Sequence, residues 1–213
     1  MGSARAHHGP GRRVQANIFY PERNALAFSE SNLVEGAIGA PVWLLTHNPY
    51  ATHNIAALLS FVIAGTGAYY LVRYLTGSRG AAAVAGVLYA FCPFTFARTA
   101  HIQLLHTGGI PFCLLAFHRL VDKVTVSRAV VLGVLLWLQA LACAYYGIFA
   151  GLMVGLGTIV VAFTRRRWRD SDYWIAIGLA AFVSVALTFP FFLPYISVQQ
   201  DTGFARTLDD ARQ

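Results

Sequence analysis

The sequence predicts an all-α integral membrane protein with about six transmembrane helices and one short interfacial or re-entrant helix. Hydrophobic residues make up 57% of the 213 residues, and only 12% are charged. The mean hydropathy is +0.55, a balance that is rare in a soluble domain of this size. Long apolar stretches alternate with short loops, and the basic residues fall in every second loop.

The predicted spans follow from length. A helix needs about 20 mostly apolar residues to cross about 30 Å of hydrocarbon, because it rises about 1.5 Å per residue. The run from Ala129 to Thr164 would extend about 54 Å as one helix, so we expect two spans that turn near Tyr145-Tyr146-Gly147. The predicted spans are residues 53–75, 81–98, 105–121, 128–144, 147–164 and 174–196.

The basic residues support this division. With a turn near Tyr145, nine of the sixteen basic residues gather on one side, as the positive-inside rule expects of the cytoplasmic face, and both termini are expected outside. The net charge of +7 then reflects topology, and we expect no nucleic-acid partner because no basic stripe is interleaved with aromatics. The sorted residues are Arg73, Arg79, Arg119, Lys123, Arg128, Arg165, Arg166, Arg167 and Arg169.

The segment before the first span contains a short apolar stretch at 33–46. It is too short to cross, which is typical of an interfacial or re-entrant helix. Asn32 is placed to cap this helix, with Glu35 three residues on, so we expect a structural role for Glu35. The expected organisation is a polar, disordered tail at 1–16, an outer loop at 17–52, a six-helix domain at 53–196 and an outer segment at 197–213.

Ionisable residues are absent from the spans apart from their terminal turns. This disfavours an ion-coupled transporter, for which Gln139 is the only modest polar candidate. Arg98 is the one basic residue in a short loop on the side that the positive-inside rule depletes. Either it binds an anion such as a lipid phosphate or diphosphate, or it snorkels to headgroups at a helix end.

The histidines do not predict a metal site. His101 and His106 are five residues apart, whereas helical metal-binding pairs prefer a spacing of four. His47 and His53 would complete a metal site only if the tertiary fold happened to bring them close to His101 and His106. We expect these imidazoles to form hydrogen bonds at the interface. No cofactor is expected, and a divalent cation, although compatible with the chemistry, is not indicated.

Prolines predict irregular helices. Such backbone is tolerated in a membrane only where protein covers it or where it lines a polar cavity, which favours a cavity that opens outward. Gly151 and Gly155 form a small-xxx-small pair, from which we expect a close approach of two helices. The prolines, in the outer halves of their spans, are Pro93, Pro111, Pro190 and Pro194.

Several segments together suggest a family. In their order and their agreement with the topology, they resemble bacterial multi-spanning glycosyltransferases of the GT-C class, over roughly residues 16–212. The segments are Asn17–Glu30, Leu75–Arg79, Ala90–Phe94, His101–Leu105 and Tyr145–Gly147.

The resemblance implies a location, a donor and partners. It implies a multi-pass protein of the bacterial inner (plasma) membrane, a sugar donor carried on a polyprenyl phosphate, and a cavity at the outer surface. The expected partners are membrane lipid, this donor and other transmembrane helices. In the class, an acidic residue of the first outer loop, after the first span, acts as base or metal contact. Here no apolar span precedes Asn17, residues 1–13 contain no carboxylate, and relatives continue with further spans.

Sugar transfer needs a carboxylate to accept the acceptor's proton and a cation to stabilise the departing phosphate. With the usual acid missing, Glu30 or Glu22 is the expected catalytic, acceptor-side carboxylate, and Arg98 with His101 is expected on the phosphate. The alternative is a non-catalytic, truncated module that binds polyprenyl lipid or a partner protein. The other residues expected to bind substrate are Gln103, His106, Tyr145 and Tyr146.

Overall fold

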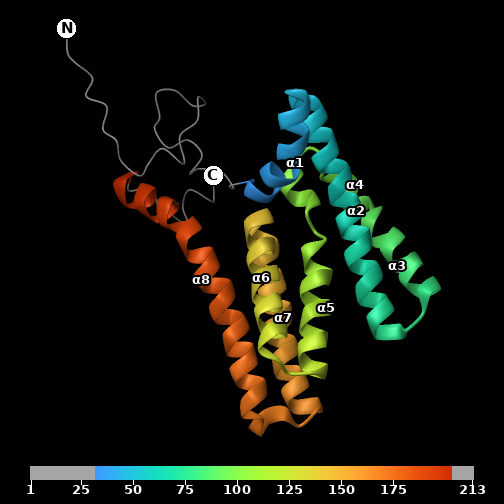
Figure 1. Ribbon diagram of the computed structural model, residues 1–213, viewed down its shortest axis with the longest axis vertical. Helices are drawn as coiled ribbons and strands as arrows, with labels where there is room; N and C mark the ends of the chain where they lie inside the picture. The colour runs from blue at the N-terminus through green and yellow to red at the C-terminus, as the bar shows by residue number, and fades with distance from the viewer. Residues whose placement is uncertain (1–31, 203–213) are drawn as a thin grey trace, which may run out of the picture. The chain divides into compact units, whose positions relative to one another are not determined.

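The computed structural model describes the backbone of Asn32–Thr202 and the side chains as far as Leu193 (Figure 1). This part of the chain contains helices and no strand, which confirms the predicted all-α class. Asn32–Thr188 form one compact unit, and the turns of α8 beyond it belong to another. The predictions for Glu22 and Glu30 lie outside the described residues.

The helices follow one another with short connections. A 3-10 turn at Ile102–Leu105 precedes α5, and another at Arg167–Arg169 precedes α8. The α-helices are α1 (Leu33–Thr46), α2 (Pro49–Thr76), α3 (Arg79–Ala90), α4 (Pro93–Ala97), α5 (Gly109–Asp122), α6 (Val126–Ala142), α7 (Ala144–Thr164) and α8 (Ser171–Thr202).

Within the described residues, five helical segments are long and apolar enough to cross a membrane, so the chain is a multi-pass membrane protein. The helix α6 is shorter, with 17 residues, a length at the lower end of what a span requires. The short apolar helix predicted at 33–46 is present as α1. The five segments are Pro49–Thr76, Arg79–Ala97, Ile102–Asp122, Ala144–Thr164 and Ser171–Leu193.

The long apolar run divides into two helices, as predicted, but earlier than predicted. The break is at Cys143, whose backbone is extended, and Tyr145 and Tyr146 lie in the first turn of α7. The amide of Cys143 closes α6 on the oxygen of Gln139. A Cβ on Gly147 would lie 2.5 Å from the Cα of Ala140. Glycine is therefore required at 147, because the two helix backbones nearly touch directly after the turn.

The prolines have three different effects. Pro93 opens α4 after α3 has ended at Ala90, so the predicted irregularity is present there. Pro111 lies in the first turn of α5, where no intrahelical bond needs its missing N–H, so the helix begins there instead of unwinding. The sequence predicts that the prolines of α8 make the helix bend or unwind. The helix continues through Pro190 and Pro194, so it does not unwind there.

The turn between α2 and α3 is built from local caps. Gly77 ends α2 with a left-handed φ of 70°, and its amide bonds to the oxygen of Arg73. The Ser78 side chain accepts from the amide of Ala81 and begins α3. These caps satisfy backbone groups that both helix ends would leave unpaired, so the two helices form a tight antiparallel hairpin (Figure 1).

The buried core lies between α5, α6, α7 and the first half of α8. The Tyr173 hydroxyl, on a side chain with no exposed surface, donates to the Thr158 oxygen at 2.9 Å and joins α8 to α7. This cluster, which we call the α5–α8 core, contains no residue of α2 or α3. Its buried members are Ala116, Phe117, Leu120, Val121, Ala129, Leu132, Val154, Ala162, Tyr173, Ala176 and Ala180.

Close helix approaches occur at glycines other than those predicted. A Cβ on Gly86 would lie 2.8 Å from the oxygen of Gly65, so α3 packs directly on α2. Nothing in the described part of the chain lies within 4 Å of a Cβ built on Gly151 or Gly155. The expectation that this pair brings two helices of this chain together is therefore wrong.

The ends of α2, α5 and α7 meet at one end of the unit. The Tyr74 hydroxyl donates to Asp122 Oδ2 at 2.6 Å, and Arg165 Nη1 donates to Asp122 Oδ1 at 2.7 Å. These contacts bring together three loops that the charge pattern places on one side. We call this end, with its arginines and Lys123, the basic end.

Candidate functional site

A carboxylate and an imidazole are buried together at the opposite end of the unit. Glu35 of α1 and His106, which precedes α5, are each 5% exposed, and Glu35 Oε1 lies 3.8 Å from His106 Nε2. The Asn32 half of the expected capping arrangement is not formed, because Asn32 has a left-handed φ of 45° and its side chain makes no cap hydrogen bond. Glu35 lies in the first turn of α1 and also contributes to tertiary packing against His106.

The backbone between the 3-10 turn and α5 is irregular, and side chains from three helices satisfy its carbonyls. Gln139 of α6 donates to the His106 oxygen at 3.0 Å. The Tyr89 hydroxyl of α3 donates to the Thr107 oxygen at 3.0 Å, and the Tyr146 hydroxyl of α7 donates to the Leu104 oxygen at 3.3 Å. Non-helical backbone is tolerated at membrane depth where protein pairs its polar groups. These three hydrogen bonds hold the backbone of Leu104–Thr107 in place. We call this cluster, formed by Tyr89, Gln139, Tyr146 and the carbonyls of Leu104, His106 and Thr107, the polar knot.

The knot includes three residues that the sequence suggested for substrate binding or transport. His106 and Tyr146 are buried, and both take part in hydrogen bonds of the knot. Gln139 is 2% exposed, and a Cβ on Gly109 would lie 2.0 Å from its Oε1. A small cavity of about 190 Å³ adjoins the knot and is lined by apolar residues together with His106 and Gln139.

The remaining predicted substrate residues are at the surface. Arg98, directly after α4, places its guanidinium 5.4 Å from the centre of the Phe94 ring. His101 and Tyr145 are exposed, and Gln103 is partly buried in the 3-10 turn. Among the described residues no three His, Cys, Asp or Glu side chains form a group that could hold a metal.

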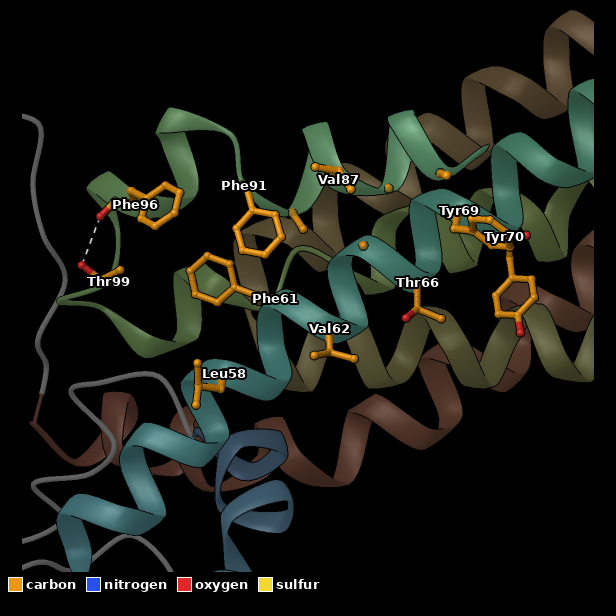
Figure 2. A pocket seen from close by; sticks show the side chains of 14 residues that line it. Leu58, Phe61, Val62, Thr66, Tyr69, Tyr70, Val87, Phe91, Phe96 and Thr99 are labelled. Carbon is orange, nitrogen blue, oxygen red and sulfur yellow. Dashed lines mark hydrogen bonds between the residues drawn. The ribbon is translucent and has the colours of Figure 1, made fainter. Parts of the chain in front are cut away.

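An apolar groove lies between α2 and α3 (Figure 2), and two of its lining residues, Phe96 and Thr99, flank Arg98 in the sequence. Phe96 and Thr99 lie at one end, Tyr69 and Tyr70 at the other. Its volume is about 830 Å³. We call it the α2–α3 groove. Its lining residues are Leu58, Phe61, Val62, Gly65, Thr66, Tyr69, Tyr70, Ala83, Gly86, Val87, Ala90, Phe91, Phe96 and Thr99.

The groove follows the membrane-crossing direction of α2. From Leu58 to Tyr70 the helix rises about 18 Å, more than half of the roughly 30 Å of hydrocarbon. Sequence analysis missed the groove, since no polar signal marks it. The available signal was the run of glycines and alanines on α3, because small side chains on one wall leave space between two helices.

Comparisons with protein families, with curated proteins and with solved structures found no match for this chain. The geometry alone defines the candidate site, which consists of the α2–α3 groove, the exposed Arg98 next to Phe96 and Thr99 in the sequence, and His101.

Proposed function

We propose that the protein binds a polyprenyl-phosphate-linked sugar at the end of the membrane domain that carries Arg98, and that it transfers the sugar there. The isoprenoid chain lies in the α2–α3 groove, and the phosphate contacts Arg98. The observation that carries the proposal is the long apolar groove, one end of which is lined by Phe96 and Thr99. These two residues flank Arg98, the one basic residue in a short loop on the expected outer side.

The groove suits a hydrocarbon chain. Aromatic and aliphatic side chains form most of its wall, and the polar atoms come from Thr66, Thr99 and the two tyrosines. The Thr99 hydroxyl is already used, since it donates to the Phe96 oxygen at 3.1 Å (Figure 2). A bound isoprenoid chain would take the place of membrane lipid along this concave wall. Ligand sites are typically concave and lined by hydrophobic and aromatic side chains, as this groove is.

The Arg98 side chain is positioned to bind a phosphate group. Its guanidinium is exposed and stacked on Phe94, so it is oriented without being neutralised. Within the described part of the chain Arg98 forms no salt bridge. Guanidinium groups bind phosphate oxygens through paired, charge-assisted hydrogen bonds.

For the transfer step we retain Glu30 or Glu22 as the base that accepts the proton of the acceptor hydroxyl. The acceptor oxygen bonds to the anomeric carbon as the bond from that carbon to the phosphate oxygen breaks. The leaving group is then a polyprenyl phosphate, whose new charge Arg98 stabilises.

A non-catalytic lipid-binding module is the second candidate. One observation favours it: among the described side chains, the carboxylate near this end is Glu35, which is buried beside His106. The other described carboxylates, Asp122, Asp170 and Asp172, lie at or beside the basic end. A binding function requires only the groove and Arg98.

A matched pair of variants tests the groove. Val87 and Val84 both lie on α3 and are both 59% exposed, but only Val87 lines the groove. In proteoliposomes with a photoreactive polyprenyl phosphate, Val87→Trp should reduce labelling, and Val84→Trp should leave it unchanged. Arg98→Gln should weaken binding roughly tenfold, since a hydrogen bond to a charged group contributes about 1.5–3 kcal/mol. Equal labelling of the two valine variants would contradict the proposal.

Turnover separates the two candidates. With a radiolabelled polyprenyl-phosphate sugar, the transferase predicts release of sugar to acceptors, and Glu30→Gln or Glu22→Gln should abolish release while lipid labelling persists. Labelling without release in the unmodified chain would favour the binding module.

A further inference from the structure

We propose that a second pocket, at the basic end, binds an anionic phospholipid from the leaflet that faces this end. The pocket has a volume of about 490 Å³ and lies between α2, α5 and α6. The pocket shares Tyr70 with the far end of the α2–α3 groove. Its charged mouth lies at the basic end, whereas the proposed phosphate site of the sugar donor lies at the Arg98 end. The lining residues are Tyr70, Phe112, Leu115, Ala116, Arg119, Arg128, Val131 and Leu135.

The pocket is charged at one end and apolar at the other. Arg119 near the end of α5 and Arg128 near the start of α6 form its mouth. Phe112 and Leu135 lie seven positions deeper on the same two helices, about 10 Å along each axis. This depth is about a third of the roughly 30 Å hydrocarbon, so the pocket stays within one leaflet. An acyl chain fits the apolar part while its headgroup stays at the arginines.

The two arginines are held in place. The Arg119 guanidinium lies 5.5 Å from the centre of the Tyr74 ring. Arg128 Nη1 donates to the backbone oxygens of Arg119 and Lys123 at the end of α5. A guanidinium has five N–H donors, and these bonds use a single nitrogen of Arg128. Both cations are therefore oriented while donors remain for a ligand.

No carboxylate of the described side chains pairs with the two arginines of this mouth. Asp122 is the acidic residue beside it, but the Tyr74 hydroxyl and Arg165 occupy both of its oxygens. Among the described residues, neither Arg119 nor Arg128 belongs to a salt bridge. Basic pockets between transmembrane helices bind anionic headgroups, and the positive-inside rule places this end at the cytoplasmic leaflet. The charge therefore selects an anionic phospholipid over a zwitterionic one.

Native mass spectrometry of the purified full chain tests the selection. Phosphatidylglycerol and phosphatidylcholine with identical acyl chains are titrated separately. We expect phosphatidylglycerol to bind more than about tenfold tighter, since each arginine near the surface adds attraction. The double variant Arg119→Gln/Arg128→Gln should lose this preference. The control Arg79→Gln/Arg166→Gln removes the same charge from the basic end, outside the pocket, and should keep it.

A second pair of variants tests the acyl-chain site without changing charge. Val131 lines the pocket, whereas its neighbour Val130 does not; they are 49% and 36% exposed. Val131→Trp should weaken phosphatidylglycerol binding, and Val130→Trp should not. Arg128 also donates hydrogen bonds to the end of α5, so the arginine double variant can fail to fold. In that case the two valine variants alone test whether the pocket binds an acyl chain. Equal binding of the two lipids, equal loss in both arginine variants, or unchanged binding in Val131→Trp would each overturn the proposal.

Discussion

The contact between Gly109 and Gln139 allows a quantitative test of the polar knot. In Gly109→Ala the new Cβ would lie 2.0 Å from Gln139 Oε1, 2.9 Å from its Cδ and 3.2 Å from its Cβ. Carbon atoms pack at about 3.5–4.0 Å, so the amide must withdraw. Withdrawal breaks its hydrogen bond to the buried His106 oxygen.

Two effects contribute to the expected decrease in the free energy of unfolding. Overpacking costs about 1–3 kcal/mol. Losing the hydrogen bond adds about 0.6 kcal/mol on average and up to about 1.7 kcal/mol in membrane proteins. We therefore expect Gly109→Ala to lower the free energy of unfolding by about 2–4 kcal/mol, a decrease in melting temperature of roughly 4–16 °C for a chain of this size.

The double variant is the decisive measurement. Gln139→Ala removes the two closest atoms, Oε1 and Cδ, and leaves a Cβ at 3.2 Å from the new methyl group. Gly109→Ala should therefore destabilise the Gln139→Ala background much less than it destabilises the wild type. Equilibrium unfolding in mixed detergent micelles measures all four corners of the cycle. Gly151→Ala is the control, because nothing lies within 4 Å of a Cβ there, and it should not destabilise the protein.

The cycle should give a coupling energy of about 1–3 kcal/mol, as residues in contact usually show. Additive effects of Gly109→Ala and Gln139→Ala would refute the packing described here.

Three further outcomes are expected. In Tyr173→Phe the loss of the buried hydroxyl, which donates to a backbone oxygen of α7, should cost about 0.5–1.5 kcal/mol by unfolding in micelles; no change would show that this hydrogen bond does not stabilise the fold. Gly133→Ala brings a Cβ to 2.6 Å from the oxygen of Ala180, and since a backbone atom cannot move aside cheaply, we expect about 1–3 kcal/mol of destabilisation; wild-type stability would mean that α6 and α8 are farther apart. Single cysteines at Arg98 and Arg166, in a chain with its native cysteines replaced, should react with impermeant maleimide from opposite sides of the membrane; labelling from one side would overturn the topology.

The sequence was sufficient for the parts of the fold that depend on hydropathy and helix length. The bounds of α1 match the apolar stretch at 33–46, and the run from Ala129 to Thr164 divides as the helix rise requires. The exact break was not predictable from hydropathy. It lies at Cys143 because Gly147 allows a close approach to Ala140, a tertiary contact without a local signal.

The candidate site was predictable in part. Arg98 is exposed, as its unusual position in the charge pattern suggested. His106 and Tyr146, which are expected to bind substrate, also take part in the polar knot. Their residue types gave no basis for separating the two roles, because both depend on which backbone carbonyls the fold leaves unpaired. The partner of Glu35 is 71 positions away in the sequence, beyond the reach of local capping rules.

The separation of the α5–α8 core from the groove has an evolutionary consequence. Substitutions that widen, lengthen or reshape the α2–α3 groove touch none of the side chains of that core, and effects at distant sites usually add independently. The groove can therefore be reshaped by substitution while α5, α6, α7 and the first half of α8 keep the packing of their shared core. We expect the hairpin to tolerate more sequence change than that core.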